Sequence, residues 1–209
     1  MRTVIQRTAL VAAALAAFCH FGPSHAEPND YVLDDDHTHI VWQVNRFGFT
    51  NTIGTFTEVT GKLAFDEDAP NEGSVVAEIS LAGLRSDLAE REEIVRGSFW
   101  LDAEAYPSIK FESSSVKFID DEACSTQCGV VEGDMILRGV KAPLNLDVRI
   151  NKIGVDPVLG RRAIGFTATG SFLRSAYGVK TAIGLIGDEV TFQIEALAIA
   201  ARDTNADGL

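Results

Sequence analysis

Apolar and polar residues alternate along most of the chain with a period of two. In the clearest run, Leu144, Leu146, Val148 and Ile150 are separated by polar or charged residues. Because successive side chains of a strand point to opposite faces, such a run predicts a β-strand with one buried face. The same alternation predicts strands in residues 40–44, 62–65, 75–79, 109–112, 130–140, 164–168 and 190–194, which makes about eight in all.

Residues 86–97 break this alternation and predict one α-helix of about three turns. Helix-forming residues fill the segment, Ser86 or Asp87 is the expected N-cap, and Gly97 is the expected C-terminal stop. We therefore expect an all-β domain with one inserted helix.

Antiparallel strands that each have one apolar face must bury those faces by closing into a barrel or by pairing as a sandwich. An eight-stranded barrel is filled by its own side chains or holds one small ligand. Small residues stand among the apolar positions at Ala77, Gly139, Ala168 and Gly170, which is compatible with an open interior.

The first 26 residues are typical of a secretory signal peptide. Arg2 and Arg7 precede an apolar stretch, residues 9–18, that is too short to span a bilayer, and residues 24–26 form a small-x-small cleavage site. Phe18 before Cys19 argues against lipidation. We expect a signal peptide in residues 1–26, one mature domain in residues 27–209, and export to the periplasm if the host is a Gram-negative bacterium.

Charge and motifs exclude several functions. The chain has 18 Lys and Arg against 30 Asp and Glu, a net charge of −12 that repels a phosphate backbone, so we expect no nucleic-acid partner. The sequence also lacks the G-x-S-x-G, G-x-x-x-x-G-K, G-x-G-x-x-G and H-E-x-x-H motifs of common enzyme classes.

Cys124 and Cys128 are the two cysteines of the expected mature chain. They lie in a polar stretch that is expected to be a loop between strands. An oxidising compartment would pair them, and the chain must then turn, because four residues of extended strand are too long to bridge. The alternative is a redox-active pair, but the spacing is not C-x-x-C, so a structural disulfide is favoured.

A set of residues spread over nearly the whole mature chain carries a family resemblance. They are, in order, residues 31–34, His37, Thr38, Ile40, Trp42, Val44, Gly48, Gly54, Phe56, residues 61–66, Arg91, residues 100–102, 106–111 and 133–140, Pro143, Arg174, Ser175, Tyr177, Gly178 and residues 187–190. By their order and spacing, the chain resembles the YceI-like, polyisoprenoid-binding proteins.

The resemblance implies an eight-stranded, lipocalin-like antiparallel barrel with a helical insertion. It also implies an elongated apolar cavity that holds an isoprenoid chain, such as the tail of a quinone or of a polyprenyl lipid. The chain departs from the family pattern at Thr38, where Ser is usual, and at Arg46, where His is common. The second difference is expected to affect headgroup preference or the pH response of the pocket.

The expected ligand contacts are inward-facing apolar residues and a few polar residues near the mouth of the barrel. For any single aromatic residue, core packing is the simpler interpretation. Trp100 and Leu101 are either part of a mobile lid or hold the helix on the barrel wall, and Arg91 and Arg174 contact a headgroup or pair with surface carboxylates. The full set is Ile40, Trp42, Val44, Phe56, Leu63, Phe65, Ile79, Trp100, Leu101, Ile109, Phe111, Leu137, Leu146, Val148, Phe166, Phe172, Phe192, His37, Arg46, Arg91 and Arg174.

His37 and His39 share a strand face and follow three aspartates, residues 34–36, which raises the hypothesis of a metal site. Only these two histidines remain after the signal peptide, so a three-histidine zinc site is excluded within one mature chain. A site of two histidines and a carboxylate is the alternative. We favour a hydrogen-bonded His37 that orients the entering chain, and predict no metal.

The sequence thus predicts a periplasmic carrier or reservoir for an isoprenoid lipid, without catalytic residues and without a cofactor. Its partners would be the isoprenoid or quinone-type lipid and a membrane protein that donates or accepts it, and the protein would be a monomer or homodimer. Two alternatives remain: a lipid-modifying enzyme that uses the same pocket with His37 as base, and a secreted interaction protein with a filled barrel.

Overall fold

The computed structural model describes residues 29–119, 124 and 127–201. The expected signal peptide lies outside the described residues. The strands are β1 (Asn29–Leu33), β2 (His39–Arg46), β3 (Thr50–Phe56), β4 (Val59–Phe65), β5 (Ser74–Ser80), β6 (Leu84–Ser86), β7 (Ser108–Ile119), β8 (Gln127–Leu137), β9 (Val140–Val155), β10 (Arg162–Leu173) and β11 (Ile186–Ala200). The α-helix is α1 (Ala89–Arg96), and short 3-10 helices are η1 (Asp35–His37), η2 (Pro70–Glu72), η3 (Leu81–Gly83) and η4 (Arg174–Tyr177).

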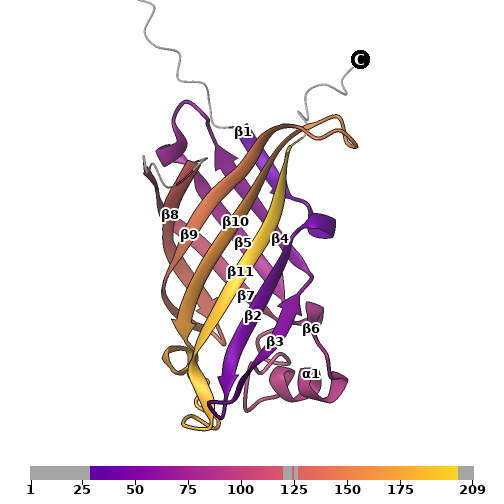
Figure 1. Ribbon diagram of the computed structural model, residues 1–209, viewed down its shortest axis with the longest axis vertical. Helices are drawn as coiled ribbons and strands as arrows, with labels where there is room; N and C mark the ends of the chain where they lie inside the picture. Colours follow the sequence, from indigo (N-terminus) through magenta and orange to yellow (C-terminus); the bar gives the residue numbers. More distant parts are fainter. Residues whose placement is uncertain (1–28, 120–123, 125–126, 202–209) are drawn as a thin grey trace, which may run out of the picture.

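The strands close into an antiparallel barrel (Figure 1). Its ring runs β1, β4, β5, β7, β8, β9, β10 and β11, and β11 returns to β1 through the pairs Tyr31 with Ala200 and Leu33 with Ala198. This confirms the eight-stranded barrel with one helix and excludes the sandwich.

More strands are assigned than the ring contains because three of its members are interrupted. β1 and β2 pair with successive parts of β11 and are separated only by η1. The second interrupted member consists of β3, which pairs with β2, and β4, which pairs with β1. The third consists of β5 and β6, which are separated by η3. The strands β2, β3 and β6 therefore continue the barrel wall at the end where α1 lies (Figure 1).

The segment predicted as one strand over residues 130–140 is instead a hairpin. Arg138 and Gly139 form the turn between β8 and β9, with φ of 52° and 74°. Two successive positive φ values are typical of a type I′ turn, whose twist matches that of the paired strands. A Cβ at Gly139 would lie 2.7 Å from the ring of Tyr106, so this small residue serves the turn and not the barrel interior.

The helix is shorter than predicted and starts later. Its N-cap is Leu88, which makes no side-chain capping bond, and neither Ser86 nor Asp87 is the cap. Ser86 belongs to β6, and its Oγ accepts from the backbone N–H of Leu88 at 3.2 Å. The predicted stop at Gly97 is confirmed, since its N–H donates to the carbonyls of Glu93 and Ile94.

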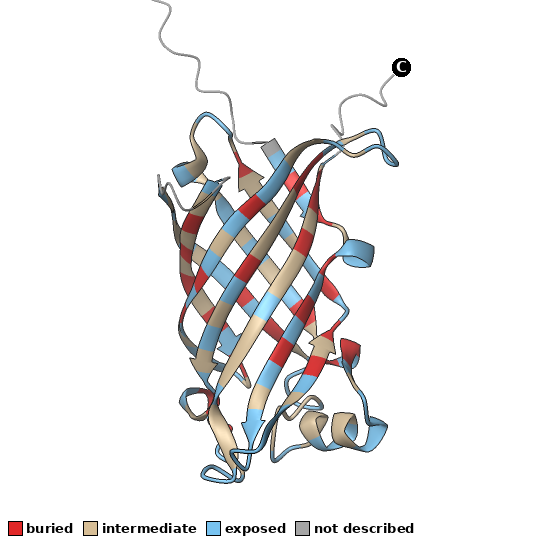
Figure 2. Cartoon of the chain, in the orientation of Figure 1, coloured by how far each residue is buried: buried red, intermediate tan, exposed pale blue. Residues whose placement is uncertain are grey.

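Side-chain burial follows the pleat of the strands. Buried residues alternate with exposed ones along parts of β2 and β9, and with half-buried ones along β8 (Figure 2). The inward faces form one apolar cluster that includes Tyr31, Ile164 and Ala198, each at most 1% exposed. None of the described helices is long and apolar enough to cross a membrane.

The disulfide between Cys124 and Cys128 is present, with its Cα atoms 6.1 Å apart. Cys124 precedes β8, where a loop was predicted, but Cys128 is the second residue of β8 and so lies on a strand. The bond connects the start of β8 to the segment before it, which agrees with the expected structural disulfide.

Candidate functional site

The barrel encloses a cavity of about 480 Å³, a volume within the range of small-molecule binding sites. It extends from Leu33 and Thr38 near one end to Trp100 and Arg174 near the other. Apolar side chains make up most of its wall. The residues predicted as ligand contacts that line it are Ile40, Trp42, Val44, Phe56, Leu63, Phe65, Ile79, Trp100, Leu101, Ile109, Phe111, Leu137, Leu146, Val148, Phe166, Phe172, Phe192, Arg46, Arg91 and Arg174.

Two lining residues of β7 escaped the sequence pattern for a physical reason. The inward positions at the start of β7 are Ile109 and Phe111, which predicts odd-numbered residues further along. A β-bulge between Ser113 and Ser115 inserts one extra residue and reverses the phase. Val116 and Phe118 therefore line the cavity.

Trp42 forms part of the cavity wall and lies over Gly54, its register partner on β3. Its ring is 6.5 Å from that of Phe56, and a Cβ at Gly54 would lie 2.2 Å from Trp42 Cζ2. The indole Nε1 is buried and makes no hydrogen bond within the described structure. Glycine at this position is what allows so large a side chain against the wall.

Arg174 is buried, with 4% of its surface exposed. The sequence left two roles open for it, contact with a headgroup or pairing with a surface carboxylate. Its guanidinium donates to four backbone carbonyls, those of Gly187, Val179, Thr181 and Ile186, at 2.8 to 3.0 Å. Burial lowers the pKa of Arg174, which nearby Asp188 opposes. The alternative of pairing with a surface carboxylate is therefore wrong, because the guanidinium is turned inward and holds the loop before β11 and the first residues of that strand.

Trp100 and Leu101 line the cavity from the segment that follows α1. Arg96 on α1 donates to the carbonyls of Leu81 and Leu84, at 3.0 and 2.6 Å, so the helix is joined to the edge of β6. The Trp100 ring lies 5.1 Å from the Arg174 guanidinium carbon. These contacts favour the anchored helix over the mobile lid.

Arg46 and Arg91 lie at the same end of the cavity as α1 and reach its wall. Arg91 forms an ion pair with Asp87, four residues earlier. Arg91 therefore both pairs with a surface carboxylate and lines the cavity, which combines the two roles that the sequence left open. The guanidinium of Arg46 lies 4.4 Å from the centre of the Phe47 ring.

His37 does not line the cavity, which corrects the prediction that it contacts the ligand. Its side chain is 68% exposed, and Nδ1 hydrogen-bonds Asp34 Oδ2 at 2.9 Å. This hydrogen bond, with the charge of Asp34, raises the pKa of His37 above 6.5. An imidazole on the outer surface is not in place to act as a base on a ligand inside the barrel.

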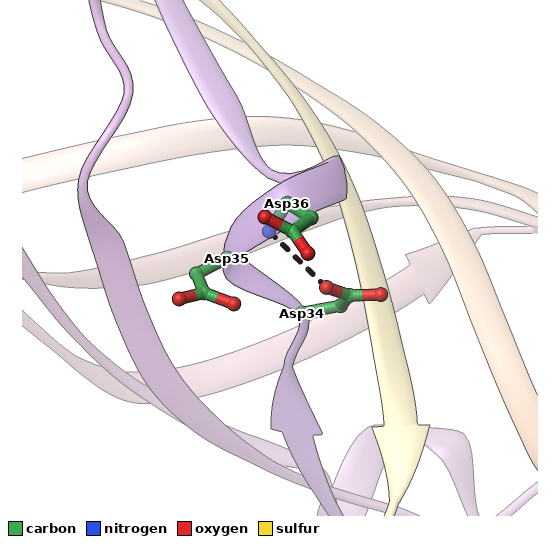
Figure 3. A group of neighbouring side chains, drawn as sticks. All are labelled: Asp34, Asp35 and Asp36. Atoms are coloured by element: carbon green, nitrogen blue, oxygen red, sulfur yellow. Dashed lines mark hydrogen bonds between the residues drawn. The ribbon is translucent and has the colours of Figure 1, made fainter.

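The three aspartates 34–36 hold carboxylate oxygens within 4.8 Å of one another (Figure 3). Asp34 Oδ1 accepts from the backbone N–H of Asp36 at 3.1 Å, which caps η1 (Figure 3). Because both Asp34 oxygens already have partners in the chain, the cluster is explained as the turn that separates β1 from β2.

A closed antiparallel barrel around an apolar cavity defines the class of small β-barrels that can hold one ligand. A model of the YceI-like domain matches residues 31–198, and the chain belongs to this family. Protein YceI of Escherichia coli O157:H7 is 31% identical over 172 residues, which cover 81% of this chain and 86% of that protein. The family resemblance seen in the sequence is confirmed.

Solved structures show the same fold. The crystal structure of Burkholderia cenocepacia BcnA matches with a TM-score of 0.67 at 20% identity, covering 79% of this chain and 98% of that one. A polyisoprenoid binding domain from Saccharophagus degradans, implicated in plant cell wall breakdown, matches with a TM-score of 0.60 at 11% identity, covering 82% and 98%.

Proposed function

We propose that this protein is an exported carrier or reservoir for an isoprenoid lipid, a quinone or a polyprenyl lipid, held in the barrel. The observation that carries the proposal is the cavity of about 480 Å³ with an almost wholly apolar wall. A filled barrel, the alternative for an interaction protein, does not agree with this open volume. The Saccharophagus degradans relative, described as polyisoprenoid binding, supports the choice of ligand.

The energetics of such binding are favourable. Each carbon of the tail that leaves water contributes about 0.8 kcal/mol, so a few isoprene units exceed the several kcal/mol lost when a flexible chain is fixed. Because apolar attraction has no direction, the cavity would accept related tails, and its length and width would set the limits.

The cavity wall supports binding and not catalysis. Among the described residues that line it, the ionisable side chains are Arg46, Arg91 and Arg174. Arginine stays protonated and is a poor general base, and these residues include no carboxylate, imidazole or thiol to take or give a proton. The enzyme alternative also loses its proposed base, His37, which lies outside.

A carrier must exchange its lipid with a membrane or a membrane protein. Phe49, in the turn between β2 and β3, and Phe99, just after α1, are 91% and 78% exposed. Their side chains offer an apolar contact with a membrane or membrane protein at the end of the barrel where α1 lies. Export to the periplasm is supported separately by residues 1–26, which are typical of a signal peptide.

The proposal is tested on protein purified from the periplasm of an expressing bacterium. Extraction with organic solvent and mass spectrometry are expected to recover an isoprenoid lipid in near-stoichiometric amount. An exported protein of similar size without a cavity, purified in parallel, controls for lipid carried over from membranes. Repeated recovery of the protein without lipid from cells rich in isoprenoids would contradict the proposal.

A further inference from the structure

Exposed apolar side chains gather at the end of the barrel where α1 lies. There the turn between β2 and β3, residues 47–49, and the loop before β11, residues 178–185, lie together at the bottom of Figure 1. The N–H of Phe47 donates to the carbonyl of Leu185 at 2.8 Å, which joins the two segments. We call residues 46–49 and 178–185 the tip. Its apolar side chains Phe47, Phe49, Ile183 and Leu185 are between 43% and 91% exposed.

The backbone of the turn holds a bulky residue where folding alone would favour a small polar one. Phe47 and Gly48 have φ of 54° and 73°, and the N–H of Phe49 donates to the carbonyl of Arg46 at 3.1 Å, which is typical of a type I′ turn. Asn, Asp or Gly usually occupies the first central position of such a turn, because a left-handed φ is costly for a bulky side chain. Phe47 serves neither the turn nor the core, so a contact outside the barrel explains its presence.

The tip is positively charged in an acidic protein. Its charged residues are Arg46 and Lys180, both exposed, and it contains no Asp or Glu, whereas the whole chain carries −12. Within the described part of the chain neither cation forms an ion pair. The guanidinium of Arg46 lies 4.4 Å from the centre of the Phe47 ring, so positive charge and apolar surface are in contact. The first acidic residue after the loop, Asp188, accepts from the N–H and the hydroxyl of Ser175.

The opposite end of the barrel also exposes apolar residues, but its charge has the other sign. Val155 and Val158, where β9 leads into β10, are exposed. The loop between β4 and β5, residues 66–73, contains four acidic residues and no basic one. An ion pair between Glu67 and Arg162 places this loop beside the turn between β9 and β10. A negatively charged surface therefore repels this end and attracts the tip, which orients the barrel.

We infer that the tip docks on the surface of an anionic lipid bilayer. The apolar side chains of the tip enter the headgroup region, and Arg46 and Lys180 lie against the lipid phosphates. Exposed apolar area together with nearby cations is the combination that binds proteins reversibly to such surfaces. Segments of four and eight residues are small for a stable protein interface, which takes about 20–30 residues a side. The inference goes beyond the proposed function, because it holds whichever lipid the cavity carries.

Sedimentation with sucrose-loaded vesicles tests the docking. One set of vesicles is phosphatidylcholine alone, and the other has equal parts of phosphatidylcholine and phosphatidylglycerol; neither contains an isoprenoid. We expect the protein to bind the anionic vesicles at least about fivefold more tightly at low salt. The preference should shrink as salt is raised towards about 1 M, because ions screen exposed charges.

Variants locate the contact. Phe49→Ser is expected to weaken vesicle binding by about tenfold, because it removes the most exposed apolar side chain of the tip. Lys180→Gln should weaken binding to the anionic vesicles by about fivefold at low salt and leave binding to the neutral ones unchanged. The matched controls are Val158→Ser and Lys152→Gln, exposed residues away from the tip, and neither should change vesicle binding.

Hydrogen exchange of the unaltered protein gives a readout that does not depend on any variant folding. Amides of residues 46–50 and 178–185 should exchange more slowly with anionic vesicles present, while those of residues 155–161 stay unchanged. Absence of vesicle binding, equal affinity for both kinds of vesicle, or equal losses in Phe49→Ser and Val158→Ser would overturn the inference and point to a protein partner. None of these results affects the lipid recovered by extraction, so the carrier proposal stands or fails separately.

Discussion

At the residue scale, Gly54 and Trp42 show how one missing side chain shapes the cavity. The two residues are register partners, and the indole occupies the space that a Cβ on Gly54 would need. The carbonyl of Arg85 is also only 2.9 Å from that position, so the backbone adds to the restriction. Trp42 can therefore stay against the wall and leave the centre of the barrel open.

Gly54→Ala is expected to force the indole of Trp42 from the wall and to lower the free energy of unfolding by about 1–3 kcal/mol. Thermal unfolding measures the loss, and tryptophan fluorescence the displacement. Gly165→Ala on β10 is the matched control, because nothing lies within 4 Å of a Cβ there. Equal stability of the two variants would contradict the proposed dependence.

The hydrogen bond between His37 and Asp34 predicts a pH effect with a definite sign. Because the bond raises the pKa of His37 above 6.5, its contribution to stability is full below pH 6.5 and is lost as pH rises through the folded pKa. Asp34→Asn should therefore lower the pKa of His37 and destabilise the protein more at acidic than at alkaline pH. Proton NMR of the imidazole measures the pKa.

Asp35→Asn is the control for this titration. Asp35 is exposed and the imidazole of His37 bonds Asp34 instead, so Asp35→Asn should leave the pKa of His37 near that of the unaltered protein. An equal fall in both variants would show that general negative charge, and not the Asp34 bond, sets the pKa.

At the element scale, the loop before β11 is held from inside by Arg174. Its guanidinium donates to four carbonyls: those of Val179 and Thr181 in the loop, and those of Ile186 and Gly187 at the start of β11. Asp188 continues the arrangement, since it accepts from both the N–H and the hydroxyl of Ser175, at 2.9 and 2.7 Å. The loop that closes this end is thus built on a buried charge next to Trp100.

Arg174→Met is expected to cost about 3–5 kcal/mol, because it leaves several buried carbonyls without a donor. The melting temperature should fall by about 10 °C, and amides of residues 178–187 should exchange faster with solvent. Arg149→Met, on the outer face of β9, should change stability by less than about 0.5 kcal/mol. Unaltered exchange in the loop of Arg174→Met would show that other contacts hold it.

Most of the strands could be predicted from the sequence, because a period of two depends only on the pleat, but β1, β3 and β6 were not among the predicted segments. The bulge between Ser113 and Ser115 could not be predicted. Its extra residue changes which face of β7 Val116 and Phe118 occupy, but the residue types around it give no sign of the change. The role of Arg174 was also hidden, because its partners are backbone carbonyls that carry no side-chain signal. His37 was misplaced because it does not lie on a strand. It ends η1, the short turn between β1 and β2, so the alternation of a strand does not apply to it.

At the scale of the whole molecule, the open interior is the property on which binding depends, and one substitution can remove it. Ala168 is 2% exposed and lines the cavity from the middle of β10, between Val148 and Ile194. In an open barrel, the indole of Ala168→Trp has space to enter. We expect the lipid recovered per protein to fall several-fold while the cost in stability stays within about 1–3 kcal/mol.

Thr169→Trp is the matched control, because the neighbouring side chain faces outward and is exposed. It adds the same indole to the same strand without entering the cavity, so it should retain the lipid. If Ala168→Trp unfolds the protein while Thr169→Trp does not, the interior is already filled and the carrier proposal fails. If Ala168→Trp folds and keeps its full lipid content, the lipid is bound elsewhere. Only loss of lipid with retention of fold agrees with a tail enclosed by the barrel.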